Sequence, residues 1–311
     1  MEKNQVAFLF PGQGSQFVGM GAELARAYPA ARQVFEAADE LLGFPLSRVA
    51  WEGPEEELND TVNTQPALFV HSAASLAVLR QEFPGLQPSL AAGHSMGELS
   101  AVWAAGALTF PDALQLVRKR GELMKRSGER SPGGMAAIMG LEIAQLEEIC
   151  SQSSRPGDLV QVANDNCPGQ VVISGHKAAL ERAVELALKA GARRAVPLAV
   201  SIASHSPLMG PAAEEFHQAV ERAHIQDPSL PIIGNVSATP LRTAQDIRTD
   251  LGAQLTSRVR WTESIRFMIQ AGITQFYEIG AGAVLTGLLK RIDRQASAAA
   301  IGAPADFASL S

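Results

Sequence analysis

The residues Leu90-Ala91-Ala92-Gly93-His94-Ser95-Met96-Gly97 form a short apolar run followed by a glycine-flanked serine. They match the G-x-S-x-G pattern, in which a buried strand turns sharply into a helix and leaves the serine at the tip of the turn. The turn strains the serine backbone, and a Cβ atom on either flanking residue would collide there, which accounts for the glycines. Ser95 is therefore predicted to present its hydroxyl as a nucleophile at the end of a sheet. The alternative is an ordinary glycine-rich turn in which Ser95 caps the helix.

Short apolar runs alternate with helical patterns on both sides of this turn, which is typical of βαβ units and a mostly parallel sheet. The predicted strands are residues 6–10, 90–92, 135–139, 171–173, 196–202, 232–233 and 276–279. The predicted helices are residues 66–79, 111–127, 143–150 and 178–190, with another from residue 207. The fold class is therefore predicted to be α/β, and the biased tail after Gln295 is expected to fray.

The sequence pattern changes at Ser131-Pro132-Gly133-Gly134, and this change divides the chain. The β-α-β-α pattern that follows it has the elements for a small sheet of its own. We expect residues 128–200 to form a small inserted subdomain, and residues 1–127 and 201–311 to form one large discontinuous domain. The predicted strand at 196–202 is expected to return the chain to the large sheet.

The composition excludes several classes of protein. Of the 311 residues, 46% are hydrophobic and 19% are charged, which is ample apolar material for a sizeable core. The net charge of -6 argues against a general affinity for nucleic acid. No apolar run approaches the roughly 18 residues of a membrane helix. Cys150 and Cys167 lack any CxxC spacing, as in a reducing compartment, so we expect a cytoplasmic globular protein.

A serine nucleophile needs a base, and His205 is the strongest candidate among the six histidines. It follows the apolar run 196–202 and precedes Ser206-Pro207, which is a natural helix cap and first helical residue. This order predicts that His205 lies at the carboxyl end of a strand, where open α/β sheets build their active sites.

The other histidines are weaker candidates. His94 lies inside the turn and is expected to point away from the serine. His71 within a helix and His176 just after a strand occupy positions typical of structural histidines. His217 and His224 are seven residues apart and are expected to share a solvated face of one helix.

Metal and nucleotide chemistry find little support in the sequence. The chain has no metal-binding spacing such as HExxH. Gly12-x-Gly14 follows a predicted strand and hints at dinucleotide binding, but Phe17 stands where the pattern requires a third glycine. No Lys-Ser/Thr pair follows to make a phosphate loop. We therefore expect an exposed amide of this loop to serve as one oxyanion donor, with the amide of Met96 as the other.

Arg120 interrupts the apolar face of the helix that begins near Pro111. At about 100° per residue, one stripe of this helix contains Ala113, Leu116, Val117, Leu123 and Met124, with Arg120 in its middle. The opposite, solvent-facing side is expected to carry Arg118, Lys119, Lys125 and Arg126. A guanidinium keeps its proton, so burying it calls for an anionic partner. That partner is either an internal carboxylate or the free carboxylate of a substrate, whose planar shape suits a forked donor.

Several further segments, each modest alone, form a specific ordered set with these residues. They are Phe10-Pro11-Gly12-Gln13-Gly14-Ser15-Gln16, Thr64-Gln65-Pro66-Ala67-Leu68, Gly93-His94-Ser95-Met96-Gly97-Glu98, Arg120-Gly121, Asn166-Cys167-Pro168-Gly169-Gln170-Val171-Val172-Ile173-Ser174-Gly175, Ser204-His205-Ser206, Asn235-Val236 and Gly280-Ala281-Gly282-Ala283-Val284-Leu285. In this order they resemble the malonyl-CoA:acyl-carrier-protein transacylases of fatty acid synthesis. The resemblance extends from Phe8 to about Ile292.

The resemblance implies a hydrolase-like α/β core with a mostly parallel sheet and an inserted ferredoxin-like α+β subdomain. It also implies a set of site residues: nucleophile Ser95, base His205, substrate-carboxylate ligand Arg120, oxyanion donors at the backbone amides of Gln13 and Met96, and a main-chain carbonyl at Gln254 that orients the histidine. After this glutamine the family usually has a proline before a valine and a tryptophan, whereas this chain has Arg258-Val259-Arg260-Trp261.

The implied activity is that of an acyl-carrier-protein S-malonyltransferase, which moves malonyl from malonyl-CoA to the phosphopantetheine thiol of acyl carrier protein. The implied enzyme is a monomer with no cofactor of its own and no nucleic-acid or membrane partner. Ser204 accompanies methylmalonyl preference in some polyketide acyltransferases, but stand-alone malonyl enzymes also use serine there, so malonyl is expected. The alternatives are a trans-acting polyketide synthase acyltransferase, an acyl-thioester hydrolase that has no need of Arg120, and a non-catalytic docking protein.

Overall fold

The computed structural model describes residues 5–198 and 200–310 and shows a six-stranded, mainly parallel sheet A in the order β10-β9-β1-β2-β7-β8. The bounds of its strands are β1 (Gln5–Phe10), β2 (Leu90–Gly93), β7 (Ile232–Ile233), β8 (Pro240–Leu241), β9 (Ile273–Ile279) and β10 (Ser297–Ile301). Among the described strand pairs of sheet A, only β7–β8 is antiparallel. The predicted α/β class is confirmed.

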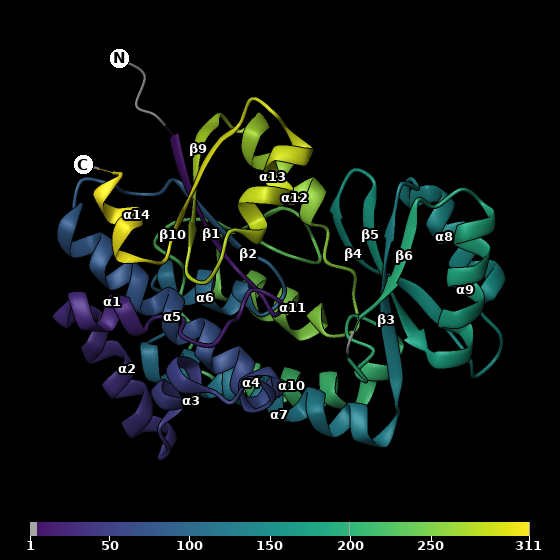
Figure 1. Ribbon diagram of the computed structural model, residues 1–311, viewed down its shortest axis with the longest axis horizontal. Helices are drawn as coiled ribbons and strands as arrows, with labels where there is room; N and C mark the ends of the chain where they lie inside the picture. Colours follow the sequence, from purple (N-terminus) through teal and green to yellow (C-terminus); the bar gives the residue numbers. More distant parts are fainter. Residues whose placement is uncertain (1–4, 199, 311) are drawn as a thin grey trace.

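Helices cover both faces of sheet A, and residues 6–10 of β1 are apolar on both faces. Phe8 and Phe10 face one core, and Ala7 and Leu9 face the other. The helices in chain order are α1 (Ala22–Ala27), α2 (Pro29–Leu42), α3 (Leu46–Glu52), α4 (Glu55–Asn59), α5 (Thr61–Glu82), α6 (Gly97–Ala104), α7 (Phe110–Arg130), α8 (Ile143–Ser153), α9 (Lys177–Lys189), α10 (Gly210–Arg222), α11 (Ala244–Gln254), α12 (Trp261–Gln270), α13 (Val284–Ile292) and α14 (Pro304–Ala308). In Figure 1 α12 and α13 lie on one side of β1 and β9, and α5 lies on the other.

The helix predicted to begin at Pro66 begins earlier. α5 starts at Thr61, where the side chain of Asp60 accepts a hydrogen bond from the Val62 N–H and caps the first turn. Pro66 therefore lies inside the helix. The Val62 carbonyl, which would accept from the N–H that proline lacks, accepts instead from Arg118 Nη1 at 3.1 Å, so it keeps a hydrogen-bond partner.

A second, antiparallel sheet B has the order β4-β5-β3-β6 and lies to the right of the larger body in Figure 1. Its strands are β3 (Gly133–Met139), β4 (Val160–Cys167), β5 (Gln170–His176) and β6 (Arg194–Pro197). With α8 and α9 they follow the order βαββαβ, as in a ferredoxin-like unit, around a separate apolar core. Two of these strands, β4 and β6, are absent from the β-α-β-α prediction. We propose residues 128–200 as the inserted subdomain, because every strand of sheet B falls inside these limits.

The strand predicted at 196–202 is wrong in its extent and in its sheet. β6 ends at Pro197 and pairs antiparallel with β3 in sheet B, where Val196 lies opposite Ala137. Ala199 lies outside the described residues, and the chain from Val200 to Ile202 is irregular. The sequence shows one continuous apolar run because the residues after β6 are also partly buried. They form an irregular connection that returns the chain to the larger body.

The tail after Gln295 does not fray as expected. Ser297–Ile301 forms β10, which pairs in parallel with β9 at the edge of sheet A, and α14 follows. The side chain of Phe307 from α14 is buried in the main core. Pairing with β9 and this anchor order a segment whose own β-propensity is weak. No helix in the described ranges has both the length and the apolar character to cross a membrane.

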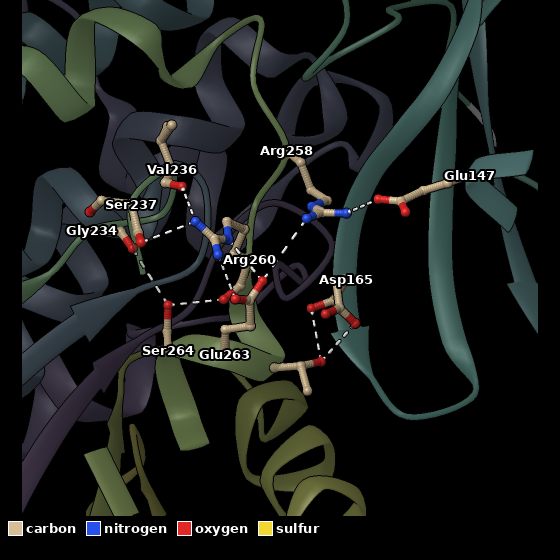
Figure 2. Close-up of polar contacts among 10 residues, drawn as sticks. Glu147, Asp165, Gly234, Val236, Ser237, Arg258, Arg260, Glu263 and Ser264 are labelled. Atoms are coloured by element: carbon tan, nitrogen blue, oxygen red, sulfur yellow. Dashed lines mark hydrogen bonds and ion pairs between the residues drawn. The ribbon is translucent and has the colours of Figure 1, made fainter. Parts of the chain in front are cut away.

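Residues 255–260 join sheet B to the larger body (Figure 2). Val259 exchanges backbone hydrogen bonds with β4, donating to Ala163 O at 2.8 Å and accepting from Asp165 N at 2.9 Å. Beside it, the guanidinium of Arg258 forms an ion pair of 2.6 Å with Glu147 of α8. Arg260 donates to main-chain carbonyls of the larger body and pairs with Glu263. This segment directly follows Gln254 and fixes the two parts of the chain around one cavity.

Candidate active site

Ser95 occupies a sharp turn between β2 and α6, with a left-handed φ of 52°. A Cβ atom on Gly93 would lie 1.8 Å from the carbonyl oxygen of Gly97. A Cβ atom on Gly97 would lie 2.2 Å from the carbonyl oxygen of Phe10 on the neighbouring strand. Both contacts are far inside van der Waals distance, so glycine is required at both positions. The turn is the strained strand-to-helix junction predicted from the sequence.

The imidazole of His205 lies directly against the serine. Its Nε2 atom is 2.8 Å from Ser95 Oγ, and its Nδ1 atom is 2.9 Å from the carbonyl oxygen of Gln254. Nδ1 also lies 3.1 Å from Ser257 O. Two carbonyl acceptors fix the proton on Nδ1, so Nε2 is free to accept the proton of the serine hydroxyl. The end of α11 supplies the Gln254 carbonyl, because the last carbonyls of a helix have no helical partner.

Burial, together with the nearby charge of Arg120, lowers the pKa of His205 to about 3. The imidazole is therefore neutral at physiological pH, as a proton acceptor must be. Its position differs from the prediction, because no strand of the large sheet leads into it. His205 lies in a loop with a φ of 58°, ahead of the 3-10 turn Pro207–Met209 that Ser206 caps. Gln161 of β4 holds this loop through a 2.7 Å hydrogen bond from its Nε2 atom to His205 O.

Three of the other histidine predictions need correction. His94 does not point away: its ring lines the same cavity as the serine, with Nε2 2.8 Å from Asn166 Oδ1. His217 and His224 are both exposed but share no helix face, because α10 ends at Arg222. His71 fits the structural role expected, since it is buried and its Nε2 atom contacts Gly302 O at 2.9 Å.

Arg120 is buried beside the nucleophile, and its hydrogen-bond partners are neutral. Its Nη2 atom donates to Ser95 Oγ at 3.1 Å and to Gln254 Oε1 at 2.9 Å, and Nη1 donates to Gln65 Oε1 at 2.9 Å. Nη1 also contacts the sulfur of Met124 at 3.1 Å. Within residues 5–198 and 200–310 no carboxylate forms an ion pair with this guanidinium. Burial lowers the pKa of Arg120 to about 10, which leaves it charged at neutral pH.

The basic side chains on the opposite face of α7 are less free than the helical pattern indicates. Arg118, Lys119 and Arg126 are only partly exposed, and Lys125 is exposed. Three of the four pair with acidic residues, in the ion pairs Arg118–Glu122, Lys125–Asp60 and Arg126–Glu215. The predicted solvated face exists, but much of its positive charge is neutralised locally.

Two backbone amides at the serine have no protein acceptor. The amide of Met96 follows the nucleophile at the start of α6, and the amide of Gln13 lies in the loop after β1. Neither donates a hydrogen bond to another group in the described part of the chain. The Gln13 loop lies close to the serine turn. A Cβ atom on Gly12 would lie only 2.4 Å from His94 O, so glycine allows this approach. The side chain of Gln13 accepts a hydrogen bond from Thr61 at 2.9 Å.

These groups meet in a cavity of about 480 Å³ between the larger body and sheet B. Its lining residues include Gln13, His94, Ser95, Arg120, Asn166, Ser204 and His205. Apolar side chains of β3 and β5, among them Met135 and Val172, form the wall on the side of sheet B. A group of three or more His, Cys, Asp or Glu side chains suited to a metal ion is absent from the described residues. Polar and basic side chains around one serine can activate its hydroxyl and hold an acyl group on it.

Sequence reasoning gave no role to several residues at this site. Asn235 accepts a hydrogen bond from the Ser95 N–H at 2.7 Å, and Asn166 holds His94. Both stand in the quoted motifs, which was the available signal. Gln161 holds the His205 loop and Gln65 holds Arg120. Gln161 carries no pattern that could have selected it, because its contact depends on how sheet B docks.

The fold and the arrangement of Ser95, His205 and Arg120 in one cavity agree with an acyltransferase. The chain belongs to the acyl transferase domain family, whose sequence model matches residues 7–304. It is 48% identical over 301 residues to the malonyl CoA-acyl carrier protein transacylase of Bacillus subtilis, covering 97% of this chain and 94% of the relative. It is 43% identical over 304 residues to the protein of the same name from Escherichia coli K12, covering 98% of each.

Solved structures agree in fold. The malonyl CoA-acyl carrier protein transacylase of Coxiella burnetii superposes with a TM-score of 0.95 at 40% identity, over 99% of this chain and 96% of that one. A malonyl-transacylase in complex with a type II polyketide synthase acyl-carrier protein gives a TM-score of 0.95 at 44% identity, over 98% of each chain. The family resemblance drawn from the motifs is confirmed.

Proposed function

We propose that the protein transfers malonyl from malonyl-CoA to the phosphopantetheine thiol of an acyl carrier protein through a malonyl-serine intermediate. The observation that carries this proposal is the buried Arg120 guanidinium, 3.1 Å from Ser95 Oγ and without a carboxylate partner in the described chain. A cation held in this way beside a nucleophile suits an acyl group that ends in a carboxylate. The names of the relatives fit the same substrate pair.

The first half-reaction forms the acyl-enzyme. Ser95 Oγ attacks the thioester carbonyl carbon while His205 Nε2 takes its proton. The amides of Gln13 and Met96 receive the resulting oxyanion, and each such donor lowers the barrier by on the order of 3 kcal/mol. The C–S bond then breaks, and the imidazolium returns the proton to the sulfur of the departing CoA. Arg120 holds the malonyl carboxylate throughout.

The second half-reaction repeats these steps with a new thiol. The phosphopantetheine sulfur attacks the ester carbonyl as His205 removes the thiol proton. Ser95 Oγ leaves as the ester bond breaks and regains that proton from the imidazolium. The Gln254 carbonyl keeps the imidazole in the tautomer that both halves need. Every proton moves between the serine, the histidine and a thiol, so we propose no resident cofactor.

Intact mass spectrometry tests this proposal in one experiment. The protein is incubated separately with malonyl-CoA, acetyl-CoA and methylmalonyl-CoA, and the mass gain is followed with time. Preferential gain of one malonyl group supports the proposal. Faster labelling by methylmalonyl-CoA would assign the acyl group differently, and turnover to free acid without a carrier would identify an acyl-thioester hydrolase.

A polyketide pathway is the second candidate context, because one structural neighbour holds a type II polyketide synthase carrier. The acylation chemistry is the same in both contexts, and only the carrier differs. Transfer rates to a fatty acid carrier protein and to a polyketide carrier protein separate them. We place the reaction in the cytoplasm. We place it on a monomer, since one chain contains every group used above.

A further inference from the structure

Glu98 is a completely buried carboxyl group in α6 that does not line the cavity. Its Oε1 atom accepts a hydrogen bond from the backbone N–H of Asn235 at 3.1 Å. Its Oε2 atom accepts one from the side-chain amide of Gln254. A buried carboxyl with two fixed donors costs stability unless those contacts are made well, so its surroundings are organised around it. Neither contact is part of the mechanism proposed above.

The Asn235 contact leads to the serine turn. Asn235 Oδ1 accepts a hydrogen bond from the Ser95 N–H at 2.7 Å, and its Nδ2 atom donates to Gly93 O at 2.7 Å. The side chain of Asn235 is therefore hydrogen-bonded to the strained turn at two points, Ser95 N–H and Gly93 O. Glu98 fixes the backbone from which this side chain projects.

The Gln254 contact leads to the other two groups of the site. Gln254 Oε1 accepts hydrogen bonds from Arg120 Nε at 3.2 Å and Nη2 at 2.9 Å, while its backbone carbonyl orients His205. If the side-chain amide of Gln254 were reversed, its N–H groups would face the N–H groups of the Arg120 guanidinium, and no acceptor would be left for them. Two acceptors of Nε2 prevent that reversal and turn Oε1 toward Arg120: the carboxyl of Glu98 and the carbonyl oxygen of Ser95, at 3.0 Å.

We propose that Glu98 is the positioning residue of this site: through Asn235 it holds the nucleophile turn, and through Gln254 it aims Arg120 at the substrate carboxylate. The inference rests on the proposed function, because it takes a carboxylate as the ligand of Arg120. Glu98 touches neither substrate nor reacting atoms and acts only through these two amide side chains.

The charge state of Glu98 matters because Glu98 lies close to the guanidinium of Arg120, which is proposed to bind a carboxylate. Burial raises the pKa of Glu98 well above its usual range, and the neighbouring Asp250 carboxyl raises it further by charge and by hydrogen bonding. Asp250 itself accepts hydrogen bonds from the N–H groups of Val236 and Ser237. A protonated Glu98 donates to Asp250 and adds no negative charge beside Arg120. The charge of the guanidinium is then left for the substrate.

Two variants separate hydrogen bonding from charge. Glu98→Leu keeps the volume but removes both acceptors, so malonyl transfer should lose about 10²–10³-fold in kcat/KM. The loss should exceed that for acetyl transfer by roughly tenfold, because only malonyl uses Arg120. Glu98→Gln keeps one acceptor and supplies an N–H to Asp250. It should stay within about tenfold of the wild type if the carboxyl is neutral.

Glu278→Gln is the matched control. Glu278 is also completely buried and accepts hydrogen bonds from two backbone amides, those of Leu285 and Thr286, but it lies in β9 and does not line the site cavity. This variant should leave the malonyl-to-acetyl ratio unchanged even if it lowers Tm. A ratio that moves equally in Glu278→Gln and Glu98→Leu would reduce Glu98 to a general structural role and overturn the proposal.

A measurement on the wild-type protein keeps the proposal testable if Glu98→Leu does not fold. The infrared band of a protonated carboxyl group should be present at neutral pH and should disappear in Glu98→Gln, with Glu278→Gln locating any second band. Loss of malonyl transfer in Glu98→Gln as severe as in Glu98→Leu, with no such band, would overturn the neutral positioning role. If the wild type is acylated only by other CoA thioesters, the proposed function fails, yet the effect of Glu98 on Ser95 acylation is still measurable.

Discussion

The Nη2 atom of Arg120 lies 3.1 Å from Oγ of Ser95, and the Nε2 atom of His205 lies 2.8 Å from the same oxygen. The serine hydroxyl can thus donate its proton to the imidazole while it accepts from the guanidinium. In the proposed mechanism, the cation that receives the substrate carboxylate therefore also contacts the atom that attacks the thioester. Neutral amide oxygens and a thioether accept from the remaining donors of Arg120. A substrate carboxylate brings the charge that these groups lack.

Replacing Arg120 by alanine should separate the substrates. Malonyl transfer should fall by roughly 10²–10⁴-fold, which corresponds to the 3–5 kcal/mol of a broken buried charge pair. Transfer of acetyl, which has no carboxylate, should be kept or increased. Both rates are measured beside a thermal melt. Parallel loss of both activities with a large fall in Tm would contradict the assignment of Arg120 to the substrate.

The acyl-enzyme should form only on Ser95. Intact Ser95→Ala protein should gain no mass with malonyl-CoA, whereas the wild type gains one malonyl group, because the strained turn exposes this hydroxyl to the base. Ser204→Ala is the matched control, since Ser204 lines the same cavity but its side chain is not among the hydrogen-bond partners of the His205 ring in the described chain. Labelling that persists in Ser95→Ala would place the nucleophile elsewhere.

Replacing His205 by alanine should slow acylation by several orders of magnitude, since no other described side chain is hydrogen-bonded to Ser95 Oγ as a proton acceptor. The double variant Ser95→Ala/His205→Ala should be little worse than either single variant, because nucleophile and base act as a unit. His217→Ala is the control, since His217 is exposed on α10. The base lies elsewhere if His205→Ala acylates at a rate near that of the wild type.

The sequence was informative where local chemistry decides the structure. The glycines around Ser95 are dictated by contacts inside one turn, and the burial of Arg120 follows from the periodicity of one helix. Both predictions needed only residues close together in the chain. The apolar strands of sheet A were found for the same reason, because each is a short run buried on both faces.

The missed features depend on distant pairing. The alanine-rich β10 is a strand only because β9 lies beside it, and β6 joins sheet B only through its register with β3. The polar run in β4 masks that strand, and its Gln161 reaches the His205 loop only after sheet B has docked. Gln65 stands in a quoted motif, but its contact with Arg120 joins two helices that are far apart in the chain, so its role in place of a carboxylate could not be predicted.

The low pKa of His205 gives a prediction for acid stability. Burial moves this pKa from its usual 6.5 to about 3 in the folded protein, with the charge of Arg120 acting in the same direction. Between these two values the unfolded chain binds a proton at this histidine and the folded protein does not. The contribution of His205 to stability is therefore complete above pH 6.5, falls as the pH falls toward 3, and is constant below it.

The non-titrating variant His205→Gln isolates this contribution. The free energy of unfolding of the wild type, minus that of His205→Gln, should decrease by up to about 1.4 kcal/mol for each pH unit in that window. Buried carboxyls such as Glu98 and Glu278, whose pKa values are raised by burial, act in the opposite sense but are present in both proteins and cancel in the difference. Urea titrations at a series of pH values provide the measurement. Parallel curves for the two proteins would mean that His205 titrates as freely in the folded enzyme as in the unfolded chain, and the neutral base required for acylation would then be lost in mild acid.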